Sequence, residues 1–427
     1  MEHGLDTGAL AVVAACFVLW GLVSARLERL NVSAPIAFVV LGLLVAHEPL
    51  SLLDVQVHSS TARGIAEITL ALVLFSDASR VNVRALRADV ALPVRLLGIG
   101  LPLTIAAGTV SAAALFGGVD LWVAALIGAI VAPTDAALGA SIMQDKRVPA
   151  RVRRVLNVES GLNDGIATPF VNLFLAGAVA AEIAHAQGVG GAAVDLLIGA
   201  GVGLGVGLIG AALLRATRRW GWSAPAFRGF AVFGLALVAY AVTIEASGNG
   251  FVGAFIGGVA FGSITPAADD HIVGFTDDAG ELLSLLVWFL FGAAMIVPAF
   301  EYMVWQDAVF ALLALTVVRM VPVGIALAGA RLDRATVAFI GWFGPRGLAS
   351  VVFVLIAFDS LDPTNGNRVL AVVTATVVLS VIAHGITAAP LAARYGRHTT
   401  TLHADLPEHA DAPALRTRSI AGDRASA

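Results

Sequence analysis

Two acidic residues and an asparagine lie within an otherwise apolar stretch of the chain, NVESGLNDGIATPFVNLFLAGAVAA at residues 157–181. A carboxylate inside a membrane costs at least roughly 2.5–3.5 kcal/mol on insertion scales, so Glu159 and Asp164 are expected to serve a function. On a helix, Glu159 and Asn163 share one face, while Ser160 and Asp164 share another. The two carboxylates are separated by roughly 140° around the helix axis, which predicts different tasks for them.

Asp164 is the residue that we expect to carry the chemistry. An aspartate in a partly desolvated cavity holds a proton more readily than one in water, so a proton and a metal cation can compete for it. Ser160 adds a neutral oxygen on the same face, and Thr134 could supply another, because hard cations such as Na⁺ favour oxygen ligands. Asp77, in LVLFSDASRVN, could cap its own span or act as an additional cation ligand. The sequence therefore predicts a site at which Na⁺ or Li⁺ and H⁺ exchange.

Two other apolar stretches are interrupted at their centres by proline. They are VAPTDAALG at 131–139, with Thr134 and Asp135, and GWFGPRGLAS at 341–350, with Arg346. Proline removes a backbone donor and clashes with the preceding helical turn. Backbone groups freed inside a membrane must line a cavity or find partners, and paired interruptions at corresponding positions indicate the binding site of a transporter.

Glu159 needs a buried cation, because an unpaired buried charge is very costly. Arg346, beside the second interruption, is the available partner, and a bidentate arginine–carboxylate pair is tolerable in a buried position. We predict that this pair, with Asn163 beside it, has a structural role and holds the two interrupted regions together.

The composition indicates a polytopic membrane protein made of α-helices. Of the 427 residues, 58% are hydrophobic and 13% are charged, whereas soluble domains average about 25% charged residues. Apolar stretches of about 20 residues recur along the chain and predict about thirteen membrane-spanning helices. The predicted spans lie near residues 8–24, 34–47, 64–79, 91–116, 119–143, 155–181, 192–214, 227–247, 250–263, 280–299, 305–329, 335–358 and 369–392.

Basic residues predict how these spans are oriented. With the N-terminus outside, the inner connections hold most of the arginines and the single lysine, and the outer connections hold only Arg63 and Arg368. This asymmetry follows the positive-inside rule and places the chain in the cytoplasmic (inner) membrane with its C-terminus in the cytoplasm. We expect a transmembrane domain at residues 1–395 and a disordered polar tail at 396–427.

Thirteen spans can be divided into six, one linker and six, which indicates an inverted repeat of the kind found in many transporters. Under that pairing the fifth span corresponds to the twelfth, and these are the two spans that carry the proline interruptions. The correspondence strengthens the prediction of a binding site between them.

Together these residues resemble the monovalent cation:proton antiporter-1 family, which includes bacterial NhaP-type antiporters and animal Na⁺/H⁺ exchangers. The resemblance covers about residues 8–393 and is carried by APTDA at 132–136, ESGLNDG at 159–165 and GWFGPRGLAS at 341–350. It implies a 13-helix fold with two inverted six-helix repeats, in which discontinuous helices 5 and 12 cross. It also implies core helices near 64–181 and 280–358, and a homodimer formed by the remaining scaffold.

The resemblance also implies roles for individual residues. Asp164 would be the ion- and proton-binding aspartate, Asn163 the asparagine that marks the electroneutral branch, and Ser160 a ligand. Glu159 and Arg346 would form the ion pair of the family, and Thr134 and Asp135 would lie at the crossing in helix 5. The sequence departs from the family pattern after Asp77, where Ala78 stands in place of the usual glycine.

The leading hypothesis is secondary antiport of Na⁺ or Li⁺ against H⁺, electroneutral and serving pH homeostasis, by a transporter rather than an enzyme. It involves membrane lipids but no resident cofactor and no nucleic acid. K⁺/H⁺ exchange is the nearest alternative, and a measurement of cation preference separates the two. An intramembrane hydrolase using Asp135 and Asp164, or a channel, would belong to a different class.

Three other features favour packing or structural roles. GAGVGLGVGLIG at 199–210 resembles a phosphate-binding loop, but it lies in an apolar span and its four-residue glycine spacing predicts helix packing. His384 is expected to be a satisfied packing residue. Arg319 is expected to pair with an acid or to bind exposed carbonyl groups, and the sequence does not indicate which residue is its partner.

Overall fold

The computed structural model describes residues 7–30, 32–53, 59–80, 91–183, 188–265, 271–403 and 406–409. Within these ranges the chain is almost entirely helical and contains no β-strand, which confirms the predicted all-α fold. Among the described residues, eight helices are long and apolar enough to cross a membrane, and four more are shorter and apolar. The count of thirteen crossings and the orientation of the termini stay predictions.

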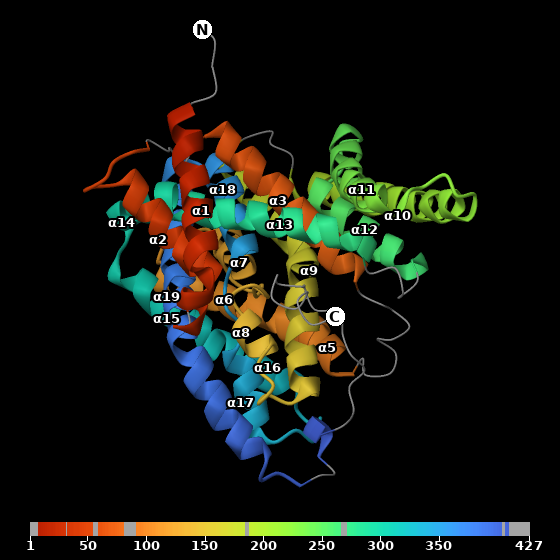
Figure 1. Ribbon diagram of the computed structural model, residues 1–427. Helices are drawn as coiled ribbons and strands as arrows, with labels where there is room; N and C mark the ends of the chain where they lie inside the picture. Colours follow the sequence, from red (N-terminus) through yellow and green to blue (C-terminus); the bar gives the residue numbers. More distant parts are fainter. Residues whose placement is uncertain are drawn as a thin grey trace.

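The helices follow one another closely along the chain (Figure 1). The first half contains α1 (Thr7–Arg29), α2 (Ala34–Ala46), α3 (Ser60–Ser79), α5 (Ala91–Arg95), the π-helical turn η1 (Leu96–Gly100), α6 (Leu101–Leu115), α7 (Leu121–Ile130), α8 (Ala140–Met143), α9 (Ala150–Glu182) and α10 (Val189–Arg219). The second half contains α11 (Pro225–Glu245), α12 (Gly250–Ile264), α13 (His271–Leu290), the π-helical turn η3 (Phe291–Met295), α14 (Ile296–Tyr302), α15 (Trp305–Leu315), α16 (Val317–Ala326), α17 (Arg334–Trp342), α18 (Leu348–Ser360), α19 (Pro363–Thr399) and the 3₁₀ turn η4 (Pro407–His409).

Polar residues with short side chains fix where several helices begin. Asp120 accepts a hydrogen bond from the Trp122 N–H at 2.8 Å at the start of α7. Asn249 likewise accepts from the Val252 N–H at 3.0 Å at the start of α12. Such N-cap residues satisfy backbone N–H groups that have no partner inside the helix, and each contributes typically about 1 kcal/mol.

Both predicted interruptions are present. Helix α7 ends at Ile130 and the chain is not α-helical again until α8, so the fifth predicted span is broken. Helix α17 ends at Trp342 and α18 begins at Leu348, so the twelfth is broken as well. A third break, at Thr316 between α15 and α16, was not predicted.

The helices pack into two groups. In one group α3, α10, α11, α12, α13 and α2 lie against one another, and in the other α6, α7, α9, α15, α18 and α19 do so. Figure 1 shows α10 and α11 projecting from one side, while α17 and α19 extend from the opposite end. The division into a core and a scaffold stays a prediction, but α3, which was expected in the core, packs against both α12 and α13.

Within the stretch 199–210, the glycines spaced four residues apart, Gly199, Gly203 and Gly207, serve close helix packing, as predicted. A Cβ atom on Gly203 would lie 2.3 Å from the Gly253 carbonyl oxygen of α12. A Cβ atom on Gly207 would lie equally close, 2.3 Å, to the Gly257 carbonyl oxygen. Any side chain at these positions would push α10 away from α12, so the stretch is a helix-packing surface.

The polar tail begins later than the composition predicted. Helix α19 continues to Thr399 instead of ending before residue 396. Beyond it, the buried Glu408 accepts a hydrogen bond from the Asp333 N–H at 2.7 Å, at the start of α17. Residues 410–427, the rest of the predicted disordered tail, lie outside the described residues.

Candidate functional site

The two interruptions lie against each other, and Asp135 joins them. The Asp135 N–H donates to the Pro345 carbonyl oxygen at 2.7 Å. One carboxylate oxygen of Asp135 accepts from the Leu348 N–H at 2.8 Å, at the first residue of α18, and the other accepts from the Ala137 N–H at 2.6 Å. Asp135 therefore caps the N-terminus of a helix that belongs to the opposite interruption, where a negative charge is favourable.

Arg346 provides the complementary contacts from the second interruption. Its side chain is completely buried. One terminal nitrogen donates to the Ala132 carbonyl oxygen at 2.7 Å, just beyond the end of α7, and the other donates to the Ala314 carbonyl oxygen at 3.1 Å, near the end of α15. A cation at the C-terminal end of a helix interacts favourably with its dipole and binds carbonyl groups left without partners. Each interruption therefore supplies the groups that the other lacks.

The predicted pairing of Glu159 with Arg346 is wrong. Glu159 instead forms an ion pair with Arg319 of α16, with an N···O distance of 2.6 Å and side chains only 3% and 2% exposed. Arg346 is occupied by the carbonyl groups of the broken helices, a kind of partner that side-chain patterns do not reveal. Arg319 thus pairs with an acid, which was one of the two alternatives expected for it.

Three polar side chains connect the first interruption to α9. The Thr134 and Ser160 hydroxyl oxygens are 2.9 Å apart, and the Asn163 amide nitrogen donates to the Thr134 hydroxyl oxygen at 2.6 Å. The Asn163 carbonyl oxygen is buried and has no hydrogen-bond partner among the described residues. Thr134 is thus held by both predicted polar faces of α9 and keeps Ser160 in place.

A small cavity, with room for about one water-sized molecule, opens beside this crossing. Asp77, Asp135, Ser160 and Asp164 line it together, so the structure brings four of the predicted ion-binding residues to one place. The remaining lining residues are Val73, Ala136, Ala137, Ser284, Trp288 and Leu348. Thr134 is not among the residues that line the cavity and lies behind Ser160.

Helices α3 and α13 close the cavity from the other group of helices. A Cβ atom on Gly161 would lie 3.8 Å from the Asp77 Cβ atom, so α3 approaches α9 next to Ser160. Ser284 and Trp288, one helical turn apart on α13, were not predicted to belong to the site. Their four-residue spacing on one helix face was the only signal available in the sequence.

His384 has a structural role, as predicted. Its Nε2 lies 2.9 Å from the Trp342 carbonyl oxygen at the end of α17, and its Nδ1 lies 2.8 Å from the Ser380 carbonyl oxygen. The Ser380 hydroxyl oxygen also accepts from the Arg346 N–H at 2.7 Å. Helix α19 thus supports the second interruption from behind.

The fold and the site define a class: a polytopic helical membrane protein in which two interrupted helices cross beside a cavity lined by buried aspartates. Residues 12–394 match the family described as sodium/hydrogen exchanger, transmembrane. The chain belongs to this family, which confirms the resemblance seen in the sequence.

Two relatives illustrate the similarity in sequence. The chain is 26% identical to the K⁺/H⁺ antiporter NhaP of Alkalimonas amylolytica over 90% of its own length and 66% of that protein. It is 27% identical to the K⁺/H⁺ antiporter NhaP2 of Shewanella sp. (strain ANA-3) over 81% of its own length and 59% of that protein. The chain therefore spans a little less than two thirds of the length of these relatives.

A solved structure shares the fold. The sodium proton antiporter MjNhaP1 from Methanocaldococcus jannaschii at pH 8 superposes with a TM-score of 0.72 at 22% sequence identity. The match covers 91% of this chain and 98% of that one. The shared fold agrees with the fold that the sequence resemblance implied.

Proposed function

We propose that the chain is a secondary antiporter that exchanges Na⁺ or Li⁺ for H⁺, with Asp164 binding proton and cation alternately. The observation that carries this proposal is the cavity at the crossing, into which three carboxylates and two serine hydroxyls converge. Carboxylate and hydroxyl oxygens are ligands that hard cations favour. Asp164 and Ser160 lie on the same face of α9 and reach the cavity together.

We infer electroneutral, one-for-one exchange from Asn163, which precedes Asp164 where the resemblance places a second aspartate in electrogenic relatives. A neutral amide at this position leaves Asp164 as the one carboxylate of the pair that can bind a proton or a cation. One proton or one monovalent cation bound at Asp164 neutralises the same single charge, so the two loaded forms carry equal charge.

K⁺/H⁺ exchange is a second candidate, favoured by the names of the relatives in Alkalimonas and Shewanella, both K⁺/H⁺ antiporters. It uses the same cavity and the same exchange at Asp164. A hydrolase with a pair of aspartates fits less well, because both carboxylate oxygens of Asp135 are engaged by backbone N–H groups. The proposal also places the chain in the inner membrane as a homodimer, N-terminus outside, with a role in pH homeostasis.

Proton movement in everted membrane vesicles tests the proposal. Vesicles energised by respiration are followed with a pH-sensitive dye while Na⁺, Li⁺ or K⁺ is added, for the unchanged chain and for Asp164→Asn. Asp278→Asn, at an exposed position on α13, is the matched control. We expect Na⁺ and Li⁺ to dissipate the proton gradient in the unchanged chain and in the control, but not in Asp164→Asn.

The other outcomes are equally informative. A response to K⁺ alone would replace the Na⁺ proposal with K⁺/H⁺ exchange. No response to any cation at any pH tested, with folded protein present in the vesicles, would overturn antiport altogether.

A further inference from the structure

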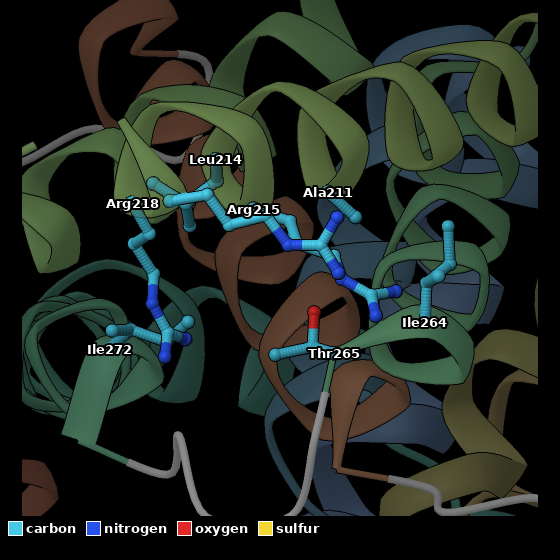
Figure 2. A pocket seen from close by; sticks show the side chains of 8 residues that line it. Ala211, Leu214, Arg215, Arg218, Ile264, Thr265 and Ile272 are labelled. Atoms are coloured by element: carbon cyan, nitrogen blue, oxygen red, sulfur yellow. The ribbon is translucent and has the colours of Figure 1, made fainter. Parts of the chain in front are cut away.

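A second cavity lies apart from the cation cavity, where α10 ends, α12 ends and α13 begins. Arg215, Arg218 and Arg219 of α10 line it. The other lining residues are Ala211, Leu214, Ile264, Thr265 and Ile272. Figure 2 shows Arg218 extending toward Ile272 and Arg215 extending toward Thr265, so the arginines reach across to the other two helices.

The three arginines are spaced so that they share one face of α10. Residues three and four apart on a helix are neighbours, and like charges at this spacing repel one another. Arg218 already takes part in another interaction, whereas Arg215 and Arg219 are exposed at the pocket. Guanidinium groups present paired N–H donors that match two oxygens of a phosphate group. A bound phosphate would therefore relieve the repulsion and use the donors.

The rest of the pocket is apolar and lies next to residues typical of a membrane surface. Ala211, Leu214 and Ile264 form a hydrocarbon wall beside the arginines. Trp220 and Trp222, immediately after α10, are 60% and 76% exposed. Exposed tryptophans are enriched where the membrane meets water, so the end of α10 is expected at the depth of the lipid headgroups.

We propose that this pocket binds the phosphate group of an anionic phospholipid, with the start of an acyl chain against its apolar wall. A soluble anion would use the arginines but not the hydrocarbon wall. Anionic lipids are also abundant at the cytoplasmic surface, the side on which the arginines are predicted to lie. The lipid would join the end of α10 to the end of α12 and the start of α13. Its binding does not depend on which cation binds in the separate cavity that contains Asp164.

Thermal unfolding of the purified full chain in detergent, followed by tryptophan fluorescence, tests the site. Phosphatidylglycerol is titrated against Arg215→Gln/Arg219→Gln and against a control, Arg394→Gln/Arg397→Gln, which removes two exposed arginines of α19 on the same predicted side. We expect phosphatidylglycerol to raise the unfolding temperature of the unchanged chain and of the control. The pocket variant should need a roughly 25-fold higher lipid concentration, at about fivefold for each arginine lost.

Further titrations distinguish the sources of the phosphate. Phosphatidylcholine and inorganic phosphate should each give a much smaller shift than phosphatidylglycerol. An equal shift with phosphatidylcholine, an equal shift with inorganic phosphate at the same concentration, or an equal loss in the control variant would each overturn the proposal. If the glutamine variant does not fold, Arg215→Lys/Arg219→Lys keeps the charge and loses the paired donors, and unchanged lipid binding by that variant would also overturn the proposal.

Discussion

Asp135 and Asp164 line the same cavity and are equally buried, each 8% exposed, yet their surroundings differ. Asp135 lies where α7 has ended, beside backbone N–H groups that no helix uses, and three of these donate to its carboxylate. The donors are the N–H groups of Ala137, Leu138 and Leu348. Asp164 lies inside α9, whose backbone N–H groups are already used within the helix, so the helix offers no cap to its carboxylate.

Burial alone therefore does not decide what an intramembrane acid does. A break in a helix supplies fixed donors and makes a carboxylate part of the framework, as at Asp135. An unbroken helix supplies none, and its carboxylate can exchange ligands, as we propose for Asp164. The comparison yields experiments in which the two residues should respond in different ways.

The largest difference is expected between Asp164→Asn and Asp135→Asn. Asp164→Asn should abolish cation-dependent proton movement while the unfolding temperature stays close to that of the unchanged chain. Asp135→Asn keeps one acceptor oxygen, so we expect reduced but measurable exchange, together with a loss of about 1–2 kcal/mol in the free energy of unfolding from the weakened cap. Vesicle assays and thermal unfolding in detergent measure the two effects. Complete loss of exchange in Asp135→Asn without any loss of stability would show that Asp135 binds the ion.

The next largest effect is expected at the buried ion pair of Glu159 and Arg319. Glu159→Gln leaves Arg319 buried without its countercharge and should cost roughly 3–5 kcal/mol of stability. Adding Arg319→Gln should restore a large part of this loss, whereas adding Arg346→Gln should destabilise the protein further, because Arg346 binds carbonyl groups. A double-mutant cycle on unfolding free energies measures both couplings. A stronger coupling of Glu159 to Arg346 than to Arg319 would contradict the geometry described above.

The sequence was sufficient to predict the helical membrane fold, both interruptions and the two polar faces of α9, because each rests on local chemistry or periodicity. It led to the wrong partner for Glu159, Arg346 instead of Arg319. The backbone carbonyl groups that occupy Arg346 become available only when broken helices meet in space. Ser284 was not predicted for a related reason. A serine on an apolar helix can be assigned to a site only when the residues that face it in the folded chain are known.

A smaller effect is expected where a hydroxyl joins the two interrupted helices. The Ser350 hydroxyl of α18 donates to the Ile130 carbonyl oxygen at the end of α7, at 2.7 Å, and both groups are buried. Ser350→Ala leaves that carbonyl without this donor and should cost about 1–3 kcal/mol. Ser360 is the matched control, since its hydroxyl donates within its own helix to the Ile356 carbonyl oxygen. Ser360→Ala should change the unfolding free energy much less, and equal losses in the two variants would argue against a special role for the crossing.

The smallest effect is expected at an ion pair outside the helices, between Asp145 and Arg147, which lie 2.6 Å apart. The hydrogen bond from Arg147 lowers the pKa of Asp145 below its ordinary value of 3.8, and partial burial of the carboxyl opposes this change. A lowered folded-state pKa adds stability above the unfolded-state value, and this contribution disappears as the pH falls through the folded-state value. Arg147→Ala should therefore lower the unfolding temperature slightly at about pH 7 and less at about pH 3, where the carboxylate is increasingly protonated. The water around Arg147 screens its charge, so the loss of stability should be far smaller than that caused by Glu159→Gln. Losses of similar size in the two variants would show that burial does not determine how much each ion pair stabilises the protein.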